Sequence, residues 1–134
     1  MTHMTPSEAF VETLAAQGVT DVFGIVGSAY MDPLDLFEPA GIRFISVAHE
    51  QGAGHMADGY SRGSAGGRVG VVTAQYGPGI ENAYGAVAHA YADSIPILLL
   101  PGGTDRKRTG VHPTFSTVHN YQGVTRWVEQ INMA

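Results

Sequence analysis

Short, uniformly apolar runs alternate with segments of helical spacing along most of this chain. The apolar runs cover residues 22–26, 42–48, 69–73 and 95–100. A strand that is apolar on both faces belongs in a parallel sheet covered on both sides, because a half-exposed strand would alternate polar and apolar residues. The pattern therefore predicts an α/β fold, a three-layer, doubly wound, mainly parallel sheet with helices on both faces. With 134 residues, one domain over residues 1–134 is expected.

The segments between the apolar runs carry the signals of helix starts and ends. Thr5, Pro6 and Glu8 have the spacing of a capping box, and Gly18 is a typical helix stop. Gly77, Pro78 and Gly79 turn the chain into another helix. We expect helices from residue 5 to 18, 32 to 37, 50 to about 61, 78 to about 91 and near 116 to 121, and a fifth strand over 124–131.

Charge and composition exclude several classes of function. The net charge is −5 and the one basic cluster, Arg106–Arg108, is short, so no nucleic-acid interface is expected. The absence of cysteine excludes disulfides and thiolate metal sites and fits a reducing cytoplasm. The longest apolar run, 95–101, is too short to cross a bilayer, and residues 1–4 contain no signal core. The sequence thus predicts a cytoplasmic protein that does not bind membranes.

Few residues of the chain are charged. Their share is 14%, against about a quarter in typical soluble domains. A small domain with so little charge is expected to bury part of its surface against a partner, in a homo- or hetero-oligomer.

Glu50 stands where an expected strand passes into a helix of unusually small residues. The small positions are Gly52, Ala53, Gly54, Ala57 and Gly59. Such residues are tolerated in a helix where another backbone packs very close, which would place Glu50 at an interface and out of bulk water. A carboxylate in the first turn is also favoured by the helix dipole alone, so a purely structural role stays open.

Three loops are expected at one edge of the sheet. They are residues 27–30, 49–51 and 75–79. Ligands of parallel α/β sheets bind outside the carboxyl ends of the strands. These loops are therefore the candidate site. Ser28 could contact a ligand there or simply cap a helix.

Two familiar motifs are present only in part. Residues 52–57 match the dinucleotide pattern G-x-G-x-x-A, but they lie inside a helix and no acidic residue follows about twenty positions later. His49 and His55 are six residues apart, which is about 600° of helix, so their rings should point apart and no zinc site is predicted. Three further histidines show no ligand spacing: His89, His112 and His119.

Several segments together resemble the pyrimidine-binding domain of thiamine-diphosphate enzymes. They are Val22–Gly27, His49–Arg62, the Gly77–Gly79 turn with Asn82, and Val124–Trp127. Each is weak alone, and the combination is specific and covers essentially the whole chain. Within this family, residues 27–32 and 49–60 look most like sulfoacetaldehyde acetyltransferases, which are similar to acetolactate synthase and pyruvate oxidase.

The resemblance implies a mechanism and roles for particular residues. The family's glutamate hydrogen-bonds the pyrimidine nitrogen N1′, so that the exocyclic nitrogen can remove the thiazolium C2 proton and the cofactor becomes a nucleophile and electron sink. Glu50 would be that catalytic residue, and a carboxyl removed from water suits the task. The resemblance also implies cofactor-binding residues: Gln75, Gly77 and Pro78 lining the pyrimidine pocket, Asn82 holding the loop or touching the ring, and the backbone of Val26 and Gly27 against the cofactor.

The sequence also departs from the family pattern. Many relatives have proline where Val26 stands, so this turn is expected to be looser. The family's Gly-Asp-Gly motif and its downstream Asn, which hold the diphosphate and Mg²⁺, do not occur. The resemblance therefore implies that this chain holds only the pyrimidine end of thiamine diphosphate. A diphosphate-binding domain or subunit would be its partner, so the chain would be a fragment of a longer enzyme or one subunit of a split enzyme.

Three functions remain open on this basis. The first is the pyrimidine domain of a sulfoacetaldehyde acetyltransferase-like enzyme, which would turn sulfoacetaldehyde and phosphate into acetyl phosphate and sulfite. The second is the small subunit of a split 2-oxoacid decarboxylase of the sulfopyruvate or phosphonopyruvate type, suggested by the short length. The third is a non-catalytic domain that only pairs with a partner.

Overall fold

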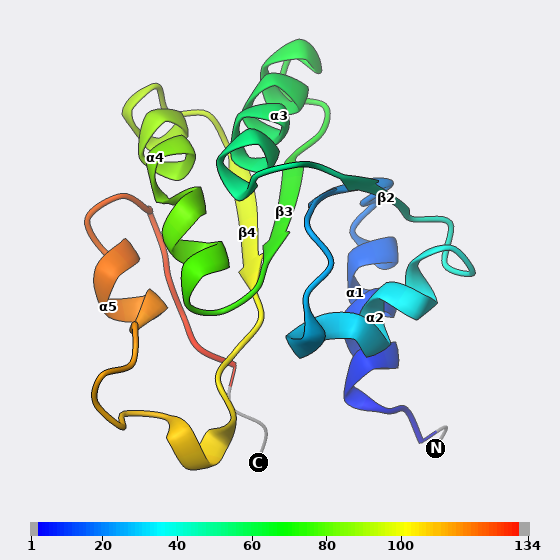
Figure 1. Cartoon of the computed structure of the whole chain (residues 1–134). Coiled ribbons are helices and arrows are strands. Elements are labelled where there is room, and N and C mark those ends of the chain that lie inside the picture. Colours follow the sequence, from blue (N-terminus) through cyan, green and yellow to red (C-terminus); the bar gives the residue numbers. More distant parts are fainter. Residues whose placement is uncertain (1–2, 132–134) are drawn as a thin grey trace.

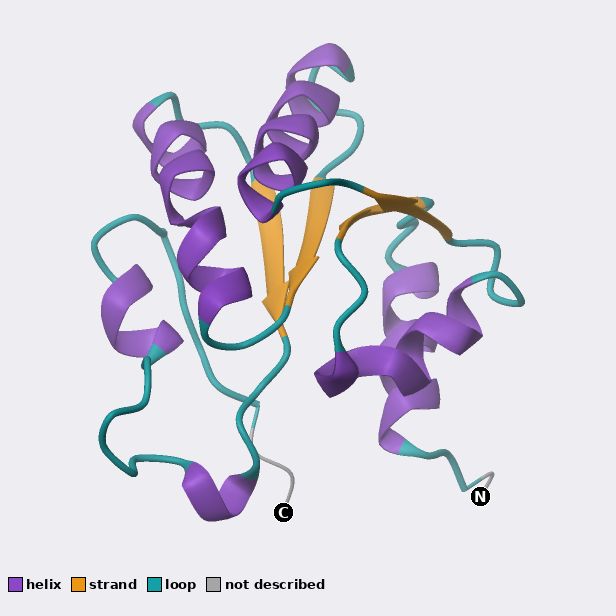
Figure 2. Ribbon diagram, in the orientation of Figure 1, coloured by secondary structure: helices purple, strands orange, loops and turns teal. Residues whose placement is uncertain are grey.

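Four parallel strands form the central sheet. The computed structural model describes residues 3–131. The strands are β1 (Asp21–Gly24), β2 (Arg43–Ser46), β3 (Gly70–Ala74) and β4 (Ile97–Pro101), in the order β2-β1-β3-β4 (Figures 1 and 2). Val22 of β1 lies between Phe44 of β2 and Val71 of β3. The predicted α/β fold with a parallel sheet is confirmed.

Helices connect the strands and cover both faces of the sheet. They are α1 (Pro6–Ala16), η1 (Ser28–Tyr30), α2 (Met31–Phe37), α3 (Glu50–Gly63), α4 (Pro78–Ala92), η2 (Arg106–Arg108) and α5 (Thr117–Tyr121). Figure 1 shows α1 and α2 together on one side and α3 and α4 on the other, with α5 beside α4. This is the three-layer arrangement expected from strands that are apolar on both faces.

Neighbouring residues of a strand contribute side chains to hydrophobic cores on opposite faces of the sheet, because side chains alternate across a sheet. Val22 and Val71 pack with Val11, Leu14 and other side chains of the α1 and α2 layer. The next residues along, Phe23 and Val72, pack with Ala53 and Ala57 of α3. A third cluster joins the end of β3 to α4 and α5: Ala74, Ile80, Ala83, Val87 and Tyr121.

The local signals read from the sequence form the expected contacts. The Thr5 hydroxyl accepts a hydrogen bond from the Glu8 N–H, and the Glu8 carboxylate accepts one from the Thr5 N–H, completing the capping box. Gly18 has a φ of +77° just beyond α1, as a helix stop requires. Gly77 has a φ of +70° before α4, and Pro78 occupies the first turn.

The small residues of α3 allow a close approach to α4. A Cβ atom on Gly54 would lie 2.5 Å from the Ala86 Cβ, well inside van der Waals contact. Gly59, on the same helix, has no atom within 4 Å of a Cβ position. Part of the close contact inferred from the sequence is therefore made within this chain, between α3 and α4.

This contrast predicts opposite effects for one substitution at two positions of α3. Gly54→Ala should lower the free energy of unfolding by about 1–3 kcal/mol, because the two helices must separate. Gly59→Ala gains the same helix propensity without a clash and should raise the free energy of unfolding by about 0.5–1 kcal/mol. Urea unfolding followed by circular dichroism measures both. Equal shifts in the two variants would contradict the packing of α3 on α4.

Two sequence expectations about strands were wrong. Residues 124–131 were expected to form a fifth strand, but they form none: Val124 and Val128 pack on the α4 and α5 cluster, while Trp127 and Ile131 are exposed. A strand needs a hydrogen-bonded neighbour, and none of the described strands pairs with this segment. The first strand was expected to reach residue 26, but β1 ends at Gly24, and Val26 is 59% exposed.

One side of β4 stays open. A cleft of about 1600 Å³ lies beside this strand, lined by Phe10 of α1, Leu98 and Leu100 of β4, and the segment 124–131. Leu98 is consequently an exposed, large apolar residue, although strands of parallel sheets are usually buried on both faces. In the part of the chain that the structure describes, no helix is long and apolar enough to span a bilayer.

Candidate functional site

The loops expected to form a site come together at one edge of the sheet. β1 leads into the loop before η1, β3 leads into the turn before α4, and α3 begins at Glu50. His49 precedes α3 and caps it, since its Nδ1 accepts a hydrogen bond from the Gln51 N–H at 3.2 Å. This imidazole is thus used in local structure, which orients the first turn that carries Glu50.

Glu50, at the start of α3, pairs with Asn82, near the start of α4. The Asn82 Nδ2 donates a hydrogen bond to the Glu50 Oε2 at 3.1 Å. Glu50 is only 9% exposed, although it is a carboxylate. Among residues 3–131, no other side chain or backbone N–H donates to this carboxylate, so its Oε1 remains available to a ligand. The close packing of α3 on α4 makes this pairing possible.

Gly79 makes room beside the free oxygen. A Cβ atom at this position would lie 3.2 Å from the Glu50 Oε1 and 3.1 Å from the Gln75 Cβ. Both distances are shorter than most real Cβ contacts, so a side chain would crowd the carboxylate. The glycine in this first turn of α4 therefore keeps the approach to Glu50 narrow but unobstructed by a side chain.

The loop after β1 docks on Gln75. The Ala29 N–H donates a hydrogen bond to the Gln75 Oε1 at 3.1 Å. A Cβ atom on Gly27 would lie 2.5 Å from that same oxygen, so only glycine allows the amide to sit there. On the far side, a Cβ on Gly102 would lie 2.8 Å from the Ala29 Cβ. The loops after β1, β3 and β4 are thereby packed into one unit.

The structure links four of the seven predicted site residues through contacts: Gly27, Gln75, Glu50 and Asn82. Gly27 contacts Gln75, Gln75 lies against Gly79, and Gly79 lies beside Glu50. Gly77 acts through its positive φ, which sets the turn. Val26 and Pro78 are exposed, and no described side chain hydrogen-bonds to either of them.

Two tyrosines support the site and were not singled out from the sequence. The Tyr30 hydroxyl donates a hydrogen bond to the Ile25 carbonyl, and its burial raises the pKa of this phenol, an effect to which the Glu50 charge adds. The Tyr121 hydroxyl donates to the Ile80 carbonyl at 2.6 Å and fixes the first turn of α4. Burial raises the pKa of Tyr121 as well, so both phenols stay neutral. Nothing in their sequence spacing reveals these contacts.

The arrangement suits a ligand that offers a hydrogen-bond donor to the Glu50 Oε1. A carboxylate with one oxygen fixed by an amide and one oxygen free can accept or return a proton at a defined point. The nearby phenols stay neutral, so they add no second negative charge beside the carboxylate. Neither Glu50 nor Asn82 lines the cleft beside β4, although Tyr30 and Tyr121 do.

Comparison with known proteins agrees with the family resemblance that the sequence suggests. Residues 4–131 match the family described as thiamine pyrophosphate enzyme, N-terminal TPP binding domain. Sulfoacetaldehyde acetyltransferase from Castellaniella defragrans is 50% identical over 128 residues, covering 90% of this chain and 21% of that protein. The enzyme of the same name from Alcaligenes xylosoxydans xylosoxydans is 51% identical over 128 residues, with the same coverage.

Acetolactate synthases are also similar to the chain. The isozyme 3 large subunit from Escherichia coli is 47% identical over 103 residues, covering 76% of this chain and 18% of that protein. The chain thus spans about a fifth of the length of the curated relatives it matches. The match to the family covers nearly every described residue, and it includes all three loops of the candidate site. The chain belongs to the thiamine pyrophosphate enzyme family, as its N-terminal TPP binding domain.

Proposed function

We propose that this chain supplies the pyrimidine half of the thiamine diphosphate site in a sulfoacetaldehyde acetyltransferase. The reaction would convert sulfoacetaldehyde and phosphate into acetyl phosphate and sulfite. The observation that carries this proposal is the buried Glu50 carboxylate, held by Asn82 through one oxygen and free at the other. The sequence identity of 50% and 51% to two sulfoacetaldehyde acetyltransferases, over 90% of the chain, supports the choice of reaction.

The described residues fit an aminopyrimidine ring. A protonated ring nitrogen is a donor, and the Glu50 Oε1 is an acceptor without a partner among residues 3–131. Gly79 has no side chain to block that oxygen, and a Cβ there would stand 3.2 Å from it. The donor and the acceptor are therefore chemically matched.

Each residue has a defined task in this proposal. When bound, thiamine diphosphate supplies a nucleophilic carbon that adds to the substrate carbonyl and stores the electron pair. Glu50 would hold the proton at the pyrimidine N1′ and is the proposed catalytic residue. Asn82 would orient the Glu50 carboxylate through its hydrogen bond. We therefore assign Asn82 as a positioning residue, whereas the sequence suggested that it holds the loop or touches the ring. The remaining proposed contacts are Gln75, Gly77 and Pro78 along the ring and the Val26 and Gly27 backbone against the cofactor.

The diphosphate and its Mg²⁺ would be held by a second domain or subunit, in a homo- or hetero-oligomer. The absence of a Gly-Asp-Gly motif from the sequence supports this assignment. The exposed small residues of α3, such as Gly52 and Gly59, offer a surface on which another backbone could pack.

The assay that tests the proposed reaction uses the protein together with its diphosphate-binding domain. With thiamine diphosphate, Mg²⁺, sulfoacetaldehyde and phosphate, we expect acetyl phosphate and sulfite in equal amounts. Omitting phosphate should abolish acetyl phosphate. Sulfite release without acetyl phosphate, or no turnover of sulfoacetaldehyde by a complex that binds the cofactor, would contradict the proposal.

Acetolactate synthesis is the second candidate, favoured by the 47% identity to the Escherichia coli large subunit. The same preparation supplied with pyruvate separates the two. An acetolactate synthase should form acetolactate from pyruvate and leave sulfoacetaldehyde unchanged. The proposed transferase should consume sulfoacetaldehyde and form no acetolactate from pyruvate.

A further inference from the structure

A second cluster of chemically active side chains lies between α3 and α4, on residues that the proposed function does not use. His55 and Asp58 come from α3, and His89 comes from α4. Each offers one ligand atom, and the three atoms all lie within 4.8 Å of one another. His55 and Asp58 share a helix face because they are three residues apart. His89 is brought beside them only by the packing of α3 on α4.

The distances place Asp58 at the centre of this cluster. The Asp58 Oδ2 lies 3.5 Å from the His89 Nδ1. The His55 and His89 rings stand edge to face, with their centroids 5.6 Å apart. Asp58 is only 4% exposed, whereas both imidazoles are exposed. A buried carboxylate thus forms the floor of a cluster whose two histidines reach it from the solvent side.

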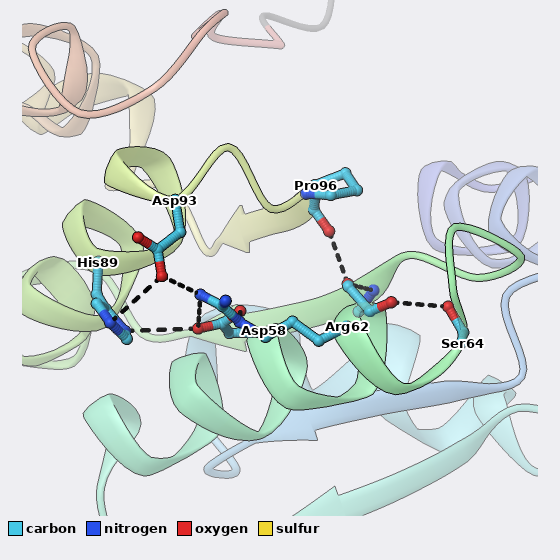
Figure 3. A network of polar contacts seen from close by, with 8 residues as sticks. Asp58, Arg62, Ser64, His89, Asp93 and Pro96 are labelled. Atoms are coloured by element: carbon cyan, nitrogen blue, oxygen red, sulfur yellow. Dashed lines mark hydrogen bonds and ion pairs between the residues drawn. The ribbon is translucent and has the colours of Figure 1, made fainter.

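Arg62 fixes Asp58 without using both of its oxygens equally. The Arg62 Nε donates to the Asp58 Oδ1 at 2.6 Å, while the contact of Nη2 with Oδ2 is a long 3.3 Å. Nη2 also donates to the Asp93 Oδ2 at 2.6 Å. Figure 3 shows His89 facing both carboxylates, with Arg62 joining them. Oδ2 is therefore the oxygen of Asp58 that is turned toward His89.

The charges favour a divalent cation at this point. The Arg62 guanidinium holds the Asp93 carboxylate beside Asp58, so a second carboxylate adjoins the cluster. The two carboxylates of Asp58 and Asp93 and the guanidinium of Arg62 together leave a net charge of −1 at this cluster. The Asp93 Oδ2 lies 3.8 Å from the His89 Nε2. A small ring rotation would let Nε2–H donate to Asp93, the arrangement in which a carboxylate orients a metal-binding histidine.

We propose that His55, Asp58 and His89 form a binding site for a zinc-type transition metal ion that joins α3 to α4. Two imidazole nitrogens and one carboxylate oxygen suit Zn²⁺ or Co²⁺, whereas Mg²⁺ prefers oxygen ligands throughout. Ligand distances of about 2.0–2.2 Å require the three atoms to draw together by roughly 1 Å, which exposed histidine side chains can do. A bound solvent molecule would complete the four ligands.

The site would clamp the two helices whose N-terminal ends carry the candidate active site. Glu50 begins α3, and Asn82 lies at the start of the second turn of α4. A metal bridge between the same helices fixes their separation, on which the hydrogen bond between Glu50 and Asn82 depends. The proposed metal site does not itself contain Glu50, so its failure would leave the proposed reaction standing.

Titration of the untagged protein with Zn²⁺ and with Co²⁺ tests the site. We expect one equivalent to bind by calorimetry, with a visible Co²⁺ absorption band typical of nitrogen and oxygen ligands, and EDTA should reverse both signals. His55→Ala and His89→Ala should each weaken the affinity at least about tenfold, since loss of an outer partner alone costs about 10–100-fold. Both histidines are exposed, so these variants should stay folded.

His119→Ala is the matched control, because it removes an exposed histidine from α5, outside the cluster. Its affinity for Zn²⁺ should equal that of the wild type. A heat-stability gain with Zn²⁺ should occur in the wild type and in this control, and vanish in His89→Ala. Equal Zn²⁺ affinity in His89→Ala and the wild type, or no saturable binding at one equivalent, would overturn the proposal.

Discussion

Replacing Glu50 with Gln is expected to lower kcat by at least about 100-fold in the protein assembled with its diphosphate-binding domain. Glutamine has the same shape and can still accept the hydrogen bond from Asn82. It cannot take or return a proton at the position of Oε1. The loss should therefore appear in the rate of acetyl phosphate formation at saturating substrate, while the free energy of unfolding changes little.

Glu81→Gln gives the matched control for this experiment. Glu81 is also a carboxylate in a helix first turn, but it is exposed and makes no contact with Glu50 in the described chain. Its removal should leave kcat unchanged. Wild-type turnover in the Glu50→Gln enzyme would refute the catalytic role of Glu50, whereas similar losses in both variants would indicate a general effect of charge near α4.

Gly70→Ala is expected to lower the free energy of unfolding by about 3 kcal/mol or more, a large part of the stability of an ordinary domain. A Cβ atom at Gly70 would lie 2.1 Å from the Ala57 carbonyl oxygen and 2.6 Å from its Cα, both backbone atoms of α3. Backbone cannot rotate away as a side chain can. The start of β3 and the body of α3 would have to move apart.

That movement would also break a buried hydrogen-bond relay. The Gly70 N–H donates to the Ser61 Oγ at 2.8 Å, and this hydroxyl donates to the Pro96 carbonyl at 2.6 Å. Urea unfolding followed by circular dichroism measures the loss. Gly123→Ala is the control, because a Cβ there meets no atom within 4 Å, and its stability should stay the same or rise by up to about 1 kcal/mol. Equal stability of the two variants would contradict the contact between β3 and α3.

The order of elements could be predicted from the sequence because it depends on short-range patterns. The four apolar runs became the four strands, and the capping box of Thr5 and Glu8 begins α1 as expected. Strand ends depend on the neighbouring strand instead. β1 stops at Gly24 because its pairing with β2 and β3 stops there, although apolar residues continue to Val26. Residues 124–131 are similarly rich in apolar side chains, yet they lack a strand partner in the described chain.

The candidate site could be predicted only in outline. Parallel strands bring their carboxyl ends to one edge, so the meeting of the loops near Glu50 followed from the fold class. The hydrogen bond from Asn82 to Glu50 did not follow, because it depends on how closely α3 crosses α4, a distance set by Gly54 and Ala86. The meeting of His55 with His89 has the same origin. The spacing of residues along one helix does not indicate which residues of a second helix lie beside them.

The open edge of β4 has a consequence for self-association. An unpaired edge strand presents backbone N–H and carbonyl groups that can template a strand from another molecule. The sequence of β4 is Ile-Leu-Leu-Leu-Pro, which has no charged side chain to oppose such pairing. Within this strand only Pro101 lacks a backbone N–H group that could donate a hydrogen bond. Copies of this chain with the edge uncovered have a concentration-dependent route to ordered aggregates. Any segment that lies along β4 closes that route, and it then protects solubility as well as burying Leu98.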